Sequence, residues 1–192
     1  MPSTPLFAPR QFFVRRTPSL AGAAVILYLT GVVAVTSGAP FVNQASTLDL
    51  SLEVILVAIL IGGGIGAAGI WVASTVLVYL LSQAVGGSGS VTRTAADVGW
   101  AALPLLVVNS ISTATVLALS VTGRLPAITS PETMPFWLVA FNALTGLLGY
   151  LWIGYLLTYA IQDARDIDVR RAGLVAGLVI TIPIGYSLSL LL

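Results

Sequence analysis

The sequence predicts an all-α integral membrane protein, a bundle of five transmembrane helices with the N-terminus inside the cell and the C-terminus outside. Three observations carry this prediction. Only 8% of the 192 residues are charged and 57% are hydrophobic, whereas soluble domains carry about 25% charged residues. Five stretches are apolar over the roughly 20 residues that a helix needs to cross a bilayer. The basic residues fall almost entirely on one side of these stretches.

Residues 1–19 are expected to lie on the cytoplasmic membrane surface, ahead of a transmembrane domain at 20–192. The segment LFAPRQFFVRR mixes three phenylalanines with three arginines, a composition suited to an anionic inner leaflet. A disordered tail is the alternative. Arg15 and Arg16 before an apolar run also fit a twin-arginine signal peptide. Because the rest of the chain spans the membrane itself, an uncleaved first helix is the simpler interpretation.

The first two spans are predicted at about 20–37 and 54–85. The first is apolar throughout and ends where a glycine and a proline follow. Glu53 precedes the second, where a negative charge suits the positive end of the helix dipole. Gly86 and Gly87 follow the second span and are predicted to cap its C-terminus.

The third span is predicted at about 92–121, after a turn rich in glycine and serine. Arg93 lies at its start, and Asp97 follows four residues later, so the two side chains share one helix face. Such a pair contributes only about 0.2–0.5 kcal/mol. Pro104 lies a few turns inside the span and is expected to kink it.

The last two spans are predicted at about 134–162 and 169–192. The fourth begins near SPETMP, where serine or threonine followed by proline is a helix start signal. Spans two to four come to about 30 residues each, or roughly 45 Å at 1.5 Å per residue. They must therefore tilt, break or project beyond the lipid.

The arginines set the predicted orientation. Seven of the eight fall before the first span or in the connections on that side, and only Arg124 falls on the other. Short loops rich in basic residues stay in the cytoplasm. We therefore expect a multi-pass protein of the cell membrane with its N-terminus inside.

Composition excludes most catalytic chemistry and nucleic-acid binding. The chain has no cysteine, histidine or lysine, so disulfides, thiolates, the usual zinc and haem ligands and Schiff bases are absent. No cofactor or metal is expected, and an intramembrane hydrolase would have to work with Ser, Tyr, Arg or Asp alone. The formal net charge of +1 supplies no field that would attract nucleic acid.

Small residues are expected to form helix-packing faces. Gly62, Gly66 and Gly69 recur at helical spacing in the second span, and small residues let helix backbones approach closely in lipid. The alternative is that glycine is simply frequent in such helices. The full set of predicted packing glycines is Gly62, Gly66, Gly69, Gly146, Gly149, Gly173 and Gly177.

Two asparagines fall inside predicted spans and form a candidate polar core. Asn109 lies in the third span and Asn142 in the fourth. A polar side chain within the membrane needs a partner and is a site candidate by default. Hydrogen bonds between helices are the favoured interpretation, and substrate contact is the alternative.

Several segments together resemble the Yip family, the multi-spanning membrane domains of the Ypt/Rab-interacting-protein type, in their prokaryotic form. The entry L-F-x-P-x-x-F-F is similar to the way such domains begin before the first span. The stretch VYLLSQAVGGSGSVTRTAADVGWAALP is similar to the most recognisable region of the family, an apolar helix, a Gly-Gly turn, a basic residue and a helix that reaches a proline. The resemblance implies a helical membrane domain, in eukaryotes one that acts in vesicle traffic with small GTPases and partner Yip proteins, and it carries over no catalytic residue.

The leading functional hypothesis is a non-enzymatic membrane protein that organises lipid or protein partners. The expected partners are membrane lipid and either further copies of the chain or other membrane proteins. A small-solute transporter, or the membrane subunit of one, is the alternative. It is motivated by the buried asparagines and by a loose repeat between 71–104 and 152–183. The sequence identifies no small-molecule ligand.

Overall fold

The computed structural model describes residues 4–45, 50–128 and 133–191, and all regular structure in this part of the chain is helical. The composition and the five apolar stretches predict this fold class, which is confirmed. The helices are α1 (Pro9–Arg15), α2 (Leu20–Thr36), α3 (Ala39–Ala45), α4 (Leu52–Ala84), α5 (Val91–Ala101), α6 (Leu103–Val121), α7 (Phe136–Arg165) and α8 (Val169–Ser189).

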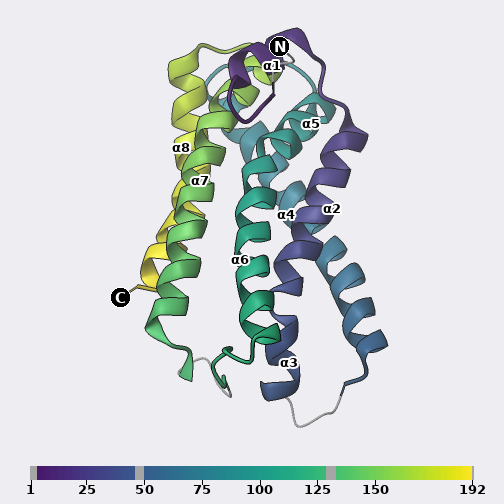
Figure 1. Cartoon of the computed structure of the whole chain (residues 1–192). Coiled ribbons are helices and arrows are strands. Elements are labelled where there is room, and N and C mark those ends of the chain that lie inside the picture. Colours follow the sequence, from purple (N-terminus) through teal and green to yellow (C-terminus); the bar gives the residue numbers. More distant parts are fainter. Residues whose placement is uncertain (1–3, 46–49, 129–132, 192) are drawn as a thin grey trace.

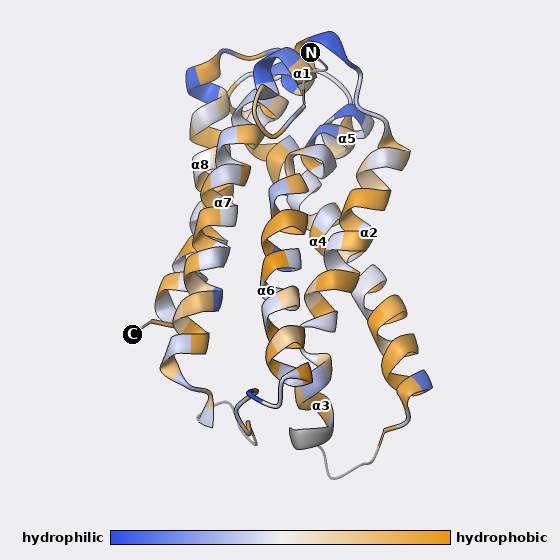
Figure 2. Ribbon diagram, viewed as in Figure 1, coloured by the Kyte–Doolittle hydropathy of each residue, from blue (hydrophilic) through white to orange (hydrophobic). Residues whose placement is uncertain are grey.

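Five helical segments are long and apolar enough to cross a membrane. They run side by side as one bundle (Figure 1), and hydrophobic residues cover most of their length while hydrophilic residues gather at the end that carries the N-terminus (Figure 2). The chain is thus a multi-pass membrane protein. Which end faces the cytoplasm stays a prediction from the arginines. The five segments are Leu20–Val42, Leu52–Ala84, Val91–Val121, Phe136–Arg165 and Val169–Ser189.

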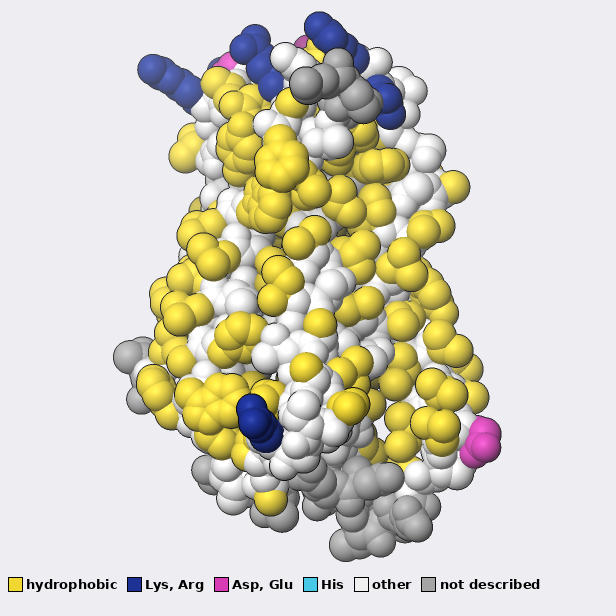
Figure 3. Space-filling model, viewed as in Figure 1, with side chains coloured by type: hydrophobic (Ala, Val, Ile, Leu, Met, Phe, Trp, Pro, Cys, Tyr) yellow, Lys and Arg dark blue, Asp and Glu magenta, His cyan; other side chains and the backbone are white. Residues whose placement is uncertain are grey.

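The helices pack as two pairs with a central element between them, and the pairs also touch directly where α4 meets α8. α2 packs against α4, and α7 packs against α8. The third span, made of α5 and α6, contacts both α2 and α7, and α1 lies against α7 at one end. The outward faces of the spans carry exposed leucine, isoleucine and valine side chains, which form the yellow middle zone of the molecule (Figure 3). An apolar surface of this extent is typical of a protein embedded in lipid.

The third span breaks where the sequence predicts a kink. α5 ends at Ala101 and α6 begins at Leu103, so only Ala102 separates them. Pro104 lies in the first turn of α6, where the missing N–H of proline costs no intrahelical hydrogen bond. The break lets α5 lean across the end of the bundle while α6 follows the other spans (Figure 1).

A close helix crossing joins α2 and α4, but not through the predicted glycines. A Cβ on Gly31 would collide with the carbonyl oxygen of Gly63, and a Cβ on Gly63 would lie 2.8 Å from the carbonyl carbon of Gly31. A Cβ on any of the predicted glycines Gly62, Gly66 and Gly69 would meet no neighbouring atom within 4 Å. Within the chain the prediction is therefore wrong for these three glycines. Gly63 makes the contact instead, on a face of α4 rotated by about 100° from that of Gly62.

The predicted glycines of α7 and α8 differ in what surrounds them. A Cβ on Gly149 would lie 3.2 Å from Val108 of α6, so that glycine permits close approach. At Gly146 and Gly173 the nearest side chains lie at ordinary contact distances of 3.7 and 3.8 Å. Gly177 faces open space. The tightest unpredicted position in these two helices is Gly154, whose Cβ would collide with Ile180.

Candidate functional site

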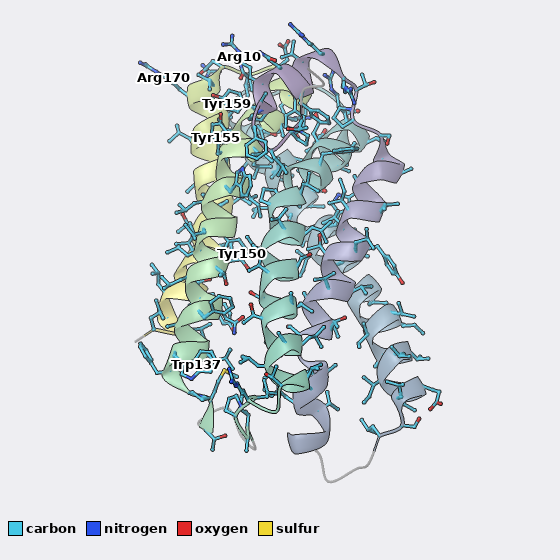
Figure 4. All side chains as sticks on the ribbon, in the orientation of Figure 1. Arg10, Trp137, Tyr150, Tyr155, Tyr159 and Arg170 are labelled. Carbon is cyan, nitrogen blue, oxygen red and sulfur yellow. The ribbon has the colours of Figure 1, made fainter. Side chains whose placement is uncertain are left out.

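One end of the bundle carries most of the charged residues that the structure describes. We call it the arginine-bearing end: α1, the loop between α4 and α5, the first turns of α5, and the turn between α7 and α8. Dark blue side chains gather there (Figure 3), and Figure 4 labels Arg10 and Arg170 among them. Arg124 lies beyond α6 at the opposite end. The exposed arginines of this end are Arg10, Arg15, Arg16, Arg93, Arg170 and Arg171.

The N-terminal segment is seated on the bundle by its aromatic side chains. Phe12 and Phe13 are 3% and 1% exposed and belong to the main hydrophobic core. The Phe12 ring lies 5.2 Å from the Trp100 ring, centroid to centroid. The indole N–H of Trp152 donates to the carbonyl oxygen of Leu6 at 3.1 Å. Two of the three phenylalanines expected at the lipid surface therefore face protein, and α1 presents its arginines outward.

The loop between α4 and α5 begins with the predicted glycine cap. Gly86 has φ +88°, a left-handed conformation that favours glycine. The Gly86 N–H donates to the carbonyl of Gln83 at 3.0 Å, and the Gly87 N–H donates to the carbonyl of Ser82 at 2.8 Å. This is the paired hydrogen-bond pattern of a Schellman cap. Ser90 then caps α5 by accepting from the N–H of Arg93 at 3.2 Å.

Arg165, at the end of α7, clamps this loop from beneath. Its side chain is 1% exposed, yet no carboxylate of the described residues lies within 4.0 Å of it. Instead its guanidinium donates to Ser82 Oγ at 2.8 Å and to the carbonyls of Gly89 and Gly87 at 2.7 and 3.2 Å. The same group stacks over the Tyr79 ring, 4.2 Å from its centroid. The loop is thereby tied to α7.

The sequence reasoning missed the role of Arg165 and counted it only as one more basic residue for orientation. No local signal separates it from Arg170 or Arg171, since all three follow the same apolar span. Only the folded arrangement brings the glycine-rich loop over it. The neighbouring backbone completes the contact, because the Ser88 N–H donates to the carbonyl oxygen of Arg165 at 2.8 Å.

Two further arginines connect α4 and α5 with α7 and α8, one from each side. Arg93 of α5 forms an ion pair with Asp163 of α7, with 2.6 Å between Nη2 and Oδ2. Arg171 of α8 donates to the carbonyl oxygen of Val85 at 3.1 Å, at the end of α4. The two arginines occupy corresponding places in the loose repeat. They join the ends of α4, α5, α7 and α8 into one surface.

The predicted ion pair of Arg93 with Asp97 is present, but it is the longer of two ion pairs that Arg93 forms. The Arg93 Nε–Asp97 Oδ2 distance is 4.0 Å, and the shorter contact goes to Asp163. Asp97 is 1% exposed, and neither of its carboxylate oxygens has a hydrogen-bond partner in the described residues. Asp163 of α7 makes the closer contact because its Oδ2 lies beside Nη2 at the guanidinium end of Arg93, whereas Asp97 Oδ2 lies near Nε at the longer distance.

Asp168 organises the turn into α8. Its carboxylate accepts from the backbone N–H groups of Arg170 and Arg171 at 2.9 and 3.1 Å and so caps the helix. These bonds, the one from Arg171 foremost, hold the pKa of the Asp168 carboxyl below its ordinary value. Arg171 Nε adds an ion pair at 3.2 Å.

A second feature lies in the half of the bundle away from the arginine-bearing end. It is a cavity of about 210 Å³ between α6 and α7, to which the ends of α2 and α8 contribute. Its lining contains both predicted asparagines and no charged side chain among the described residues. We call it the polar cavity, and Tyr150 marks its position midway along α7 (Figure 4). Its principal polar residues are Asn109, Ser112, Asn142, Thr145, Tyr150 and Tyr186.

Hydrogen bonding in the polar cavity is incomplete. Asn109 donates to the carbonyl of Thr30 at 3.5 Å, beyond the usual 2.7–3.2 Å range. Asn142 donates at 3.0 Å to Leu138 in its own helix. Ser112 and Thr145 oxygens lie 3.3 Å apart across α6 and α7. The structure therefore brings the two asparagines together without a strong bond between helices from either one.

The comparisons with known proteins give one match. A family model described as the Yip1 domain matches residues 4–191, nearly the whole chain. No curated protein and no solved structure matches. Among the described residues, no group of three or more His, Cys, Asp and Glu side chains could hold a metal ion.

Proposed function

The chain belongs to the Yip1 domain family, and on that premise we propose that it is a non-enzymatic membrane organiser that gathers anionic lipid headgroups, and the proteins that accompany them, at its arginine-bearing end. The single observation that carries the proposal is the concentration of exposed guanidinium groups there. With the N-terminus inside, this end lies at the inner leaflet of the cell membrane.

The charge of the arginine-bearing end supports lipid binding. Seven arginines and four aspartates lie there, which gives a formal net charge of +3 at this end of a chain whose total is +1. Six of the arginines are exposed, whereas Asp97 is buried and Asp163 is partly buried and paired. A basic residue near an anionic leaflet contributes about 1 kcal/mol of attraction.

The arrangement also favours a fixed platform over a flexible tail. α1 is held by Phe12 and Phe13, and the loop between α4 and α5 is held by Arg165. A surface whose groups are already positioned loses less conformational entropy when it binds. The exposed arginines therefore act together on one patch of lipid.

The test compares anionic lipid retention by two variants. The protein is reconstituted in phosphatidylcholine vesicles with phosphatidylserine, extracted gently, and the phosphatidylserine that stays bound is counted by native mass spectrometry. The triple variant Arg15→Gln, Arg16→Gln, Arg170→Gln is expected to bind phosphatidylserine roughly 100-fold more weakly, from about 1 kcal/mol for each arginine.

Arg124→Gln is the matched control, because Arg124 is also exposed but lies at the opposite end. It is expected to retain phosphatidylserine like the wild type. Equal retention by the triple variant and the wild type would remove the basis of the proposal.

A second candidate function is the passage of a small solute across the membrane. One observation favours it: Asn109 and Asn142, from two different spans, line the same cavity. Polar sites near the bilayer midplane are typical of transporters. Radiolabelled solute flux into proteoliposomes tests it, and flux unchanged by Asn109→Leu and Asn142→Leu together would exclude a path through this cavity.

A further inference from the structure

The polar cavity presents several hydrogen-bonding groups that have no partner among the described residues. In the described part of the chain, neither asparagine amide oxygen accepts a hydrogen bond, and neither the Tyr150 nor the Tyr186 hydroxyl makes one. Each amide oxygen can accept two hydrogen bonds, and each phenol can both donate and accept. In the hydrocarbon core no bulk water is present to satisfy such groups. A ligand that enters the cavity can satisfy several of them at once.

From this arrangement we propose that the polar cavity is a binding site for a neutral polyhydroxyl group, the size of a glycerol or a monosaccharide. The occupant is either a free polyol or sugar, or the uncharged headgroup of a glycolipid in the adjoining leaflet. The site is distinct from the arginine-bearing end and independent of it.

The volume of the cavity fits this class of ligand. The volume of about 210 Å³ far exceeds the roughly 10–15 Å³ that a single water molecule requires in a cavity. That space suits a compact group with several hydroxyls. The half-buried Asn109 and the buried Ser112 lie on α6, whereas Asn142 and Tyr186 stand exposed, the latter 67%. A ligand can therefore enter past Asn142 and Tyr186.

The absence of charge in the lining selects against ions. The described residues that line the cavity supply amides, hydroxyls and apolar groups but no arginine, aspartate or glutamate. An ionised headgroup placed there would lose its hydration and find no counter-ion. Hydroxyl groups, in contrast, donate to amide oxygens and accept from phenols and amide N–H groups. The lining can thus both accept hydrogen bonds from alcohol groups and donate hydrogen bonds to them.

The position of the cavity is compatible with a lipid headgroup. Trp137 and Tyr186 are exposed near the start of α7 and the end of α8, respectively, and Trp137 lies at the lower end of the view in Figure 4. Exposed tryptophan and tyrosine are enriched at the membrane–water interface. Asn142 follows Trp137 by five residues, or about 7.5 Å along a helix. The polar cavity therefore opens just below the headgroup level.

The experiment measures ligand-dependent thermal stability in phosphatidylcholine nanodiscs, with three probes added separately. The probes are glucose in solution, monoglucosyl diacylglycerol in the nanodisc, and phosphatidylserine in the nanodisc. The tested chains are the wild type, Asn109→Leu with Asn142→Leu, and Tyr186→Phe, which removes only an exposed hydroxyl. Thr115→Val is the matched control, because Thr115 bonds only to Ile111 of its own helix and lies outside the cavity.

A neutral sugar is expected to raise the unfolding temperature of the wild type and of Thr115→Val equally. The double asparagine variant is expected to bind it at least tenfold more weakly, and Tyr186→Phe to bind it with intermediate affinity. A response to glucose identifies a free solute, and a response to the glycolipid alone identifies a lipid headgroup. The proposal is overturned if neither sugar probe shifts the wild type, if the shift survives in the double variant, or if phosphatidylserine gives the shift that the double variant loses.

Discussion

The clamp formed by Arg165 gives the sharpest prediction about stability. Replacing this residue in the variant Arg165→Met keeps an apolar stem of similar reach and removes the guanidinium. Three hydrogen bonds disappear, those to Ser82 Oγ at 2.8 Å and to the carbonyls of Gly89 and Gly87 at 2.7 and 3.2 Å. The stacking over Tyr79 disappears as well.

The expected cost follows from these contacts. Hydrogen bonds that involve a charged group are worth about 1.5–3 kcal/mol each, so the gross loss from the three is about 4.5–9 kcal/mol. Part of it is regained, because a buried guanidinium without a carboxylate pays a desolvation penalty of several kcal/mol and because water can reach the exposed Gly89. We expect a net loss of about 2–4 kcal/mol in the free energy of unfolding, or roughly 4–16 °C in unfolding temperature for a chain of this size.

Thermal unfolding in nanodiscs measures the loss, and hydrogen exchange of the loop between α4 and α5 locates it. The Ser88 amide, which is bonded to the carbonyl of Arg165, is expected to exchange faster in Arg165→Met. Arg165→Lys keeps the charge but not the planar fork and is expected to fall between the two. Arg170→Met is the matched control, with an effect within about 0.5 kcal/mol because Arg170 is exposed. Equal stability of Arg165→Met and Arg170→Met would refute the clamp.

Two further predictions concern the helix crossing and the turn into α8. Gly63→Leu is expected to destabilise the protein by about 1–3 kcal/mol, because the added side chain meets the Gly31 backbone. The control Gly62→Leu, on the open face one residue away, is expected to change stability by less than about 0.5 kcal/mol. Thermal unfolding of the two variants measures the difference, and equal effects would contradict the crossing of α2 and α4 at Gly63. Since the pKa of Asp168 is lowered in the folded state, its contribution to stability is present above the unfolded pKa, about 3.9, and is lost as the pH falls through the lower folded value. Asp168→Asn still caps α8 and is expected to flatten the pH dependence of unfolding below about pH 4; an unchanged acid slope would show that Asp168 is not responsible.

The fold could be predicted from the sequence because a helix that crosses lipid must be apolar over about 20 residues. Apolar length located five spans, and the predicted limits 54–85 and 169–192 differ from α4 and α8 by at most three residues at either end. The glycine cap and the break near Pro104 were also predictable, since each depends on local backbone chemistry. The left-handed φ of Gly86 is the clearest example.

The contacts between spans were not accessible in the same way. Five glycines lie between 62 and 69 and spread over more than half of the circumference of α4, so spacing alone cannot say which of them α2 approaches. The role of Arg165 depends on a loop that lies 75 or more residues earlier in the chain. Local sequence carries no information about such a contact.

The candidate polar core was predicted in part: its asparagines were identified from the sequence, but the cavity that they share was not. Asn109 and Asn142 were identified because an amide within a span is costly without a partner. The sequence could not show that they share a cavity with Tyr150 and Tyr186, because the rotation of each helix about its axis is set by packing against its neighbours. Tyrosine is also common at membrane interfaces, so neither tyrosine stood out.

The proposed function requires that the two ends of the bundle face opposite compartments, with the arginine-bearing end in the cytoplasm. The chain has no cysteine, so single cysteines can be placed at the exposed positions Thr17, Thr92 and Thr122 and labelled in sealed cells with a membrane-impermeant thiol reagent. We predict that Thr122→Cys is labelled from outside, and that Thr17→Cys and Thr92→Cys are labelled only after the membrane is opened. Labelling of Thr92→Cys and Thr122→Cys from the same side would contradict the account.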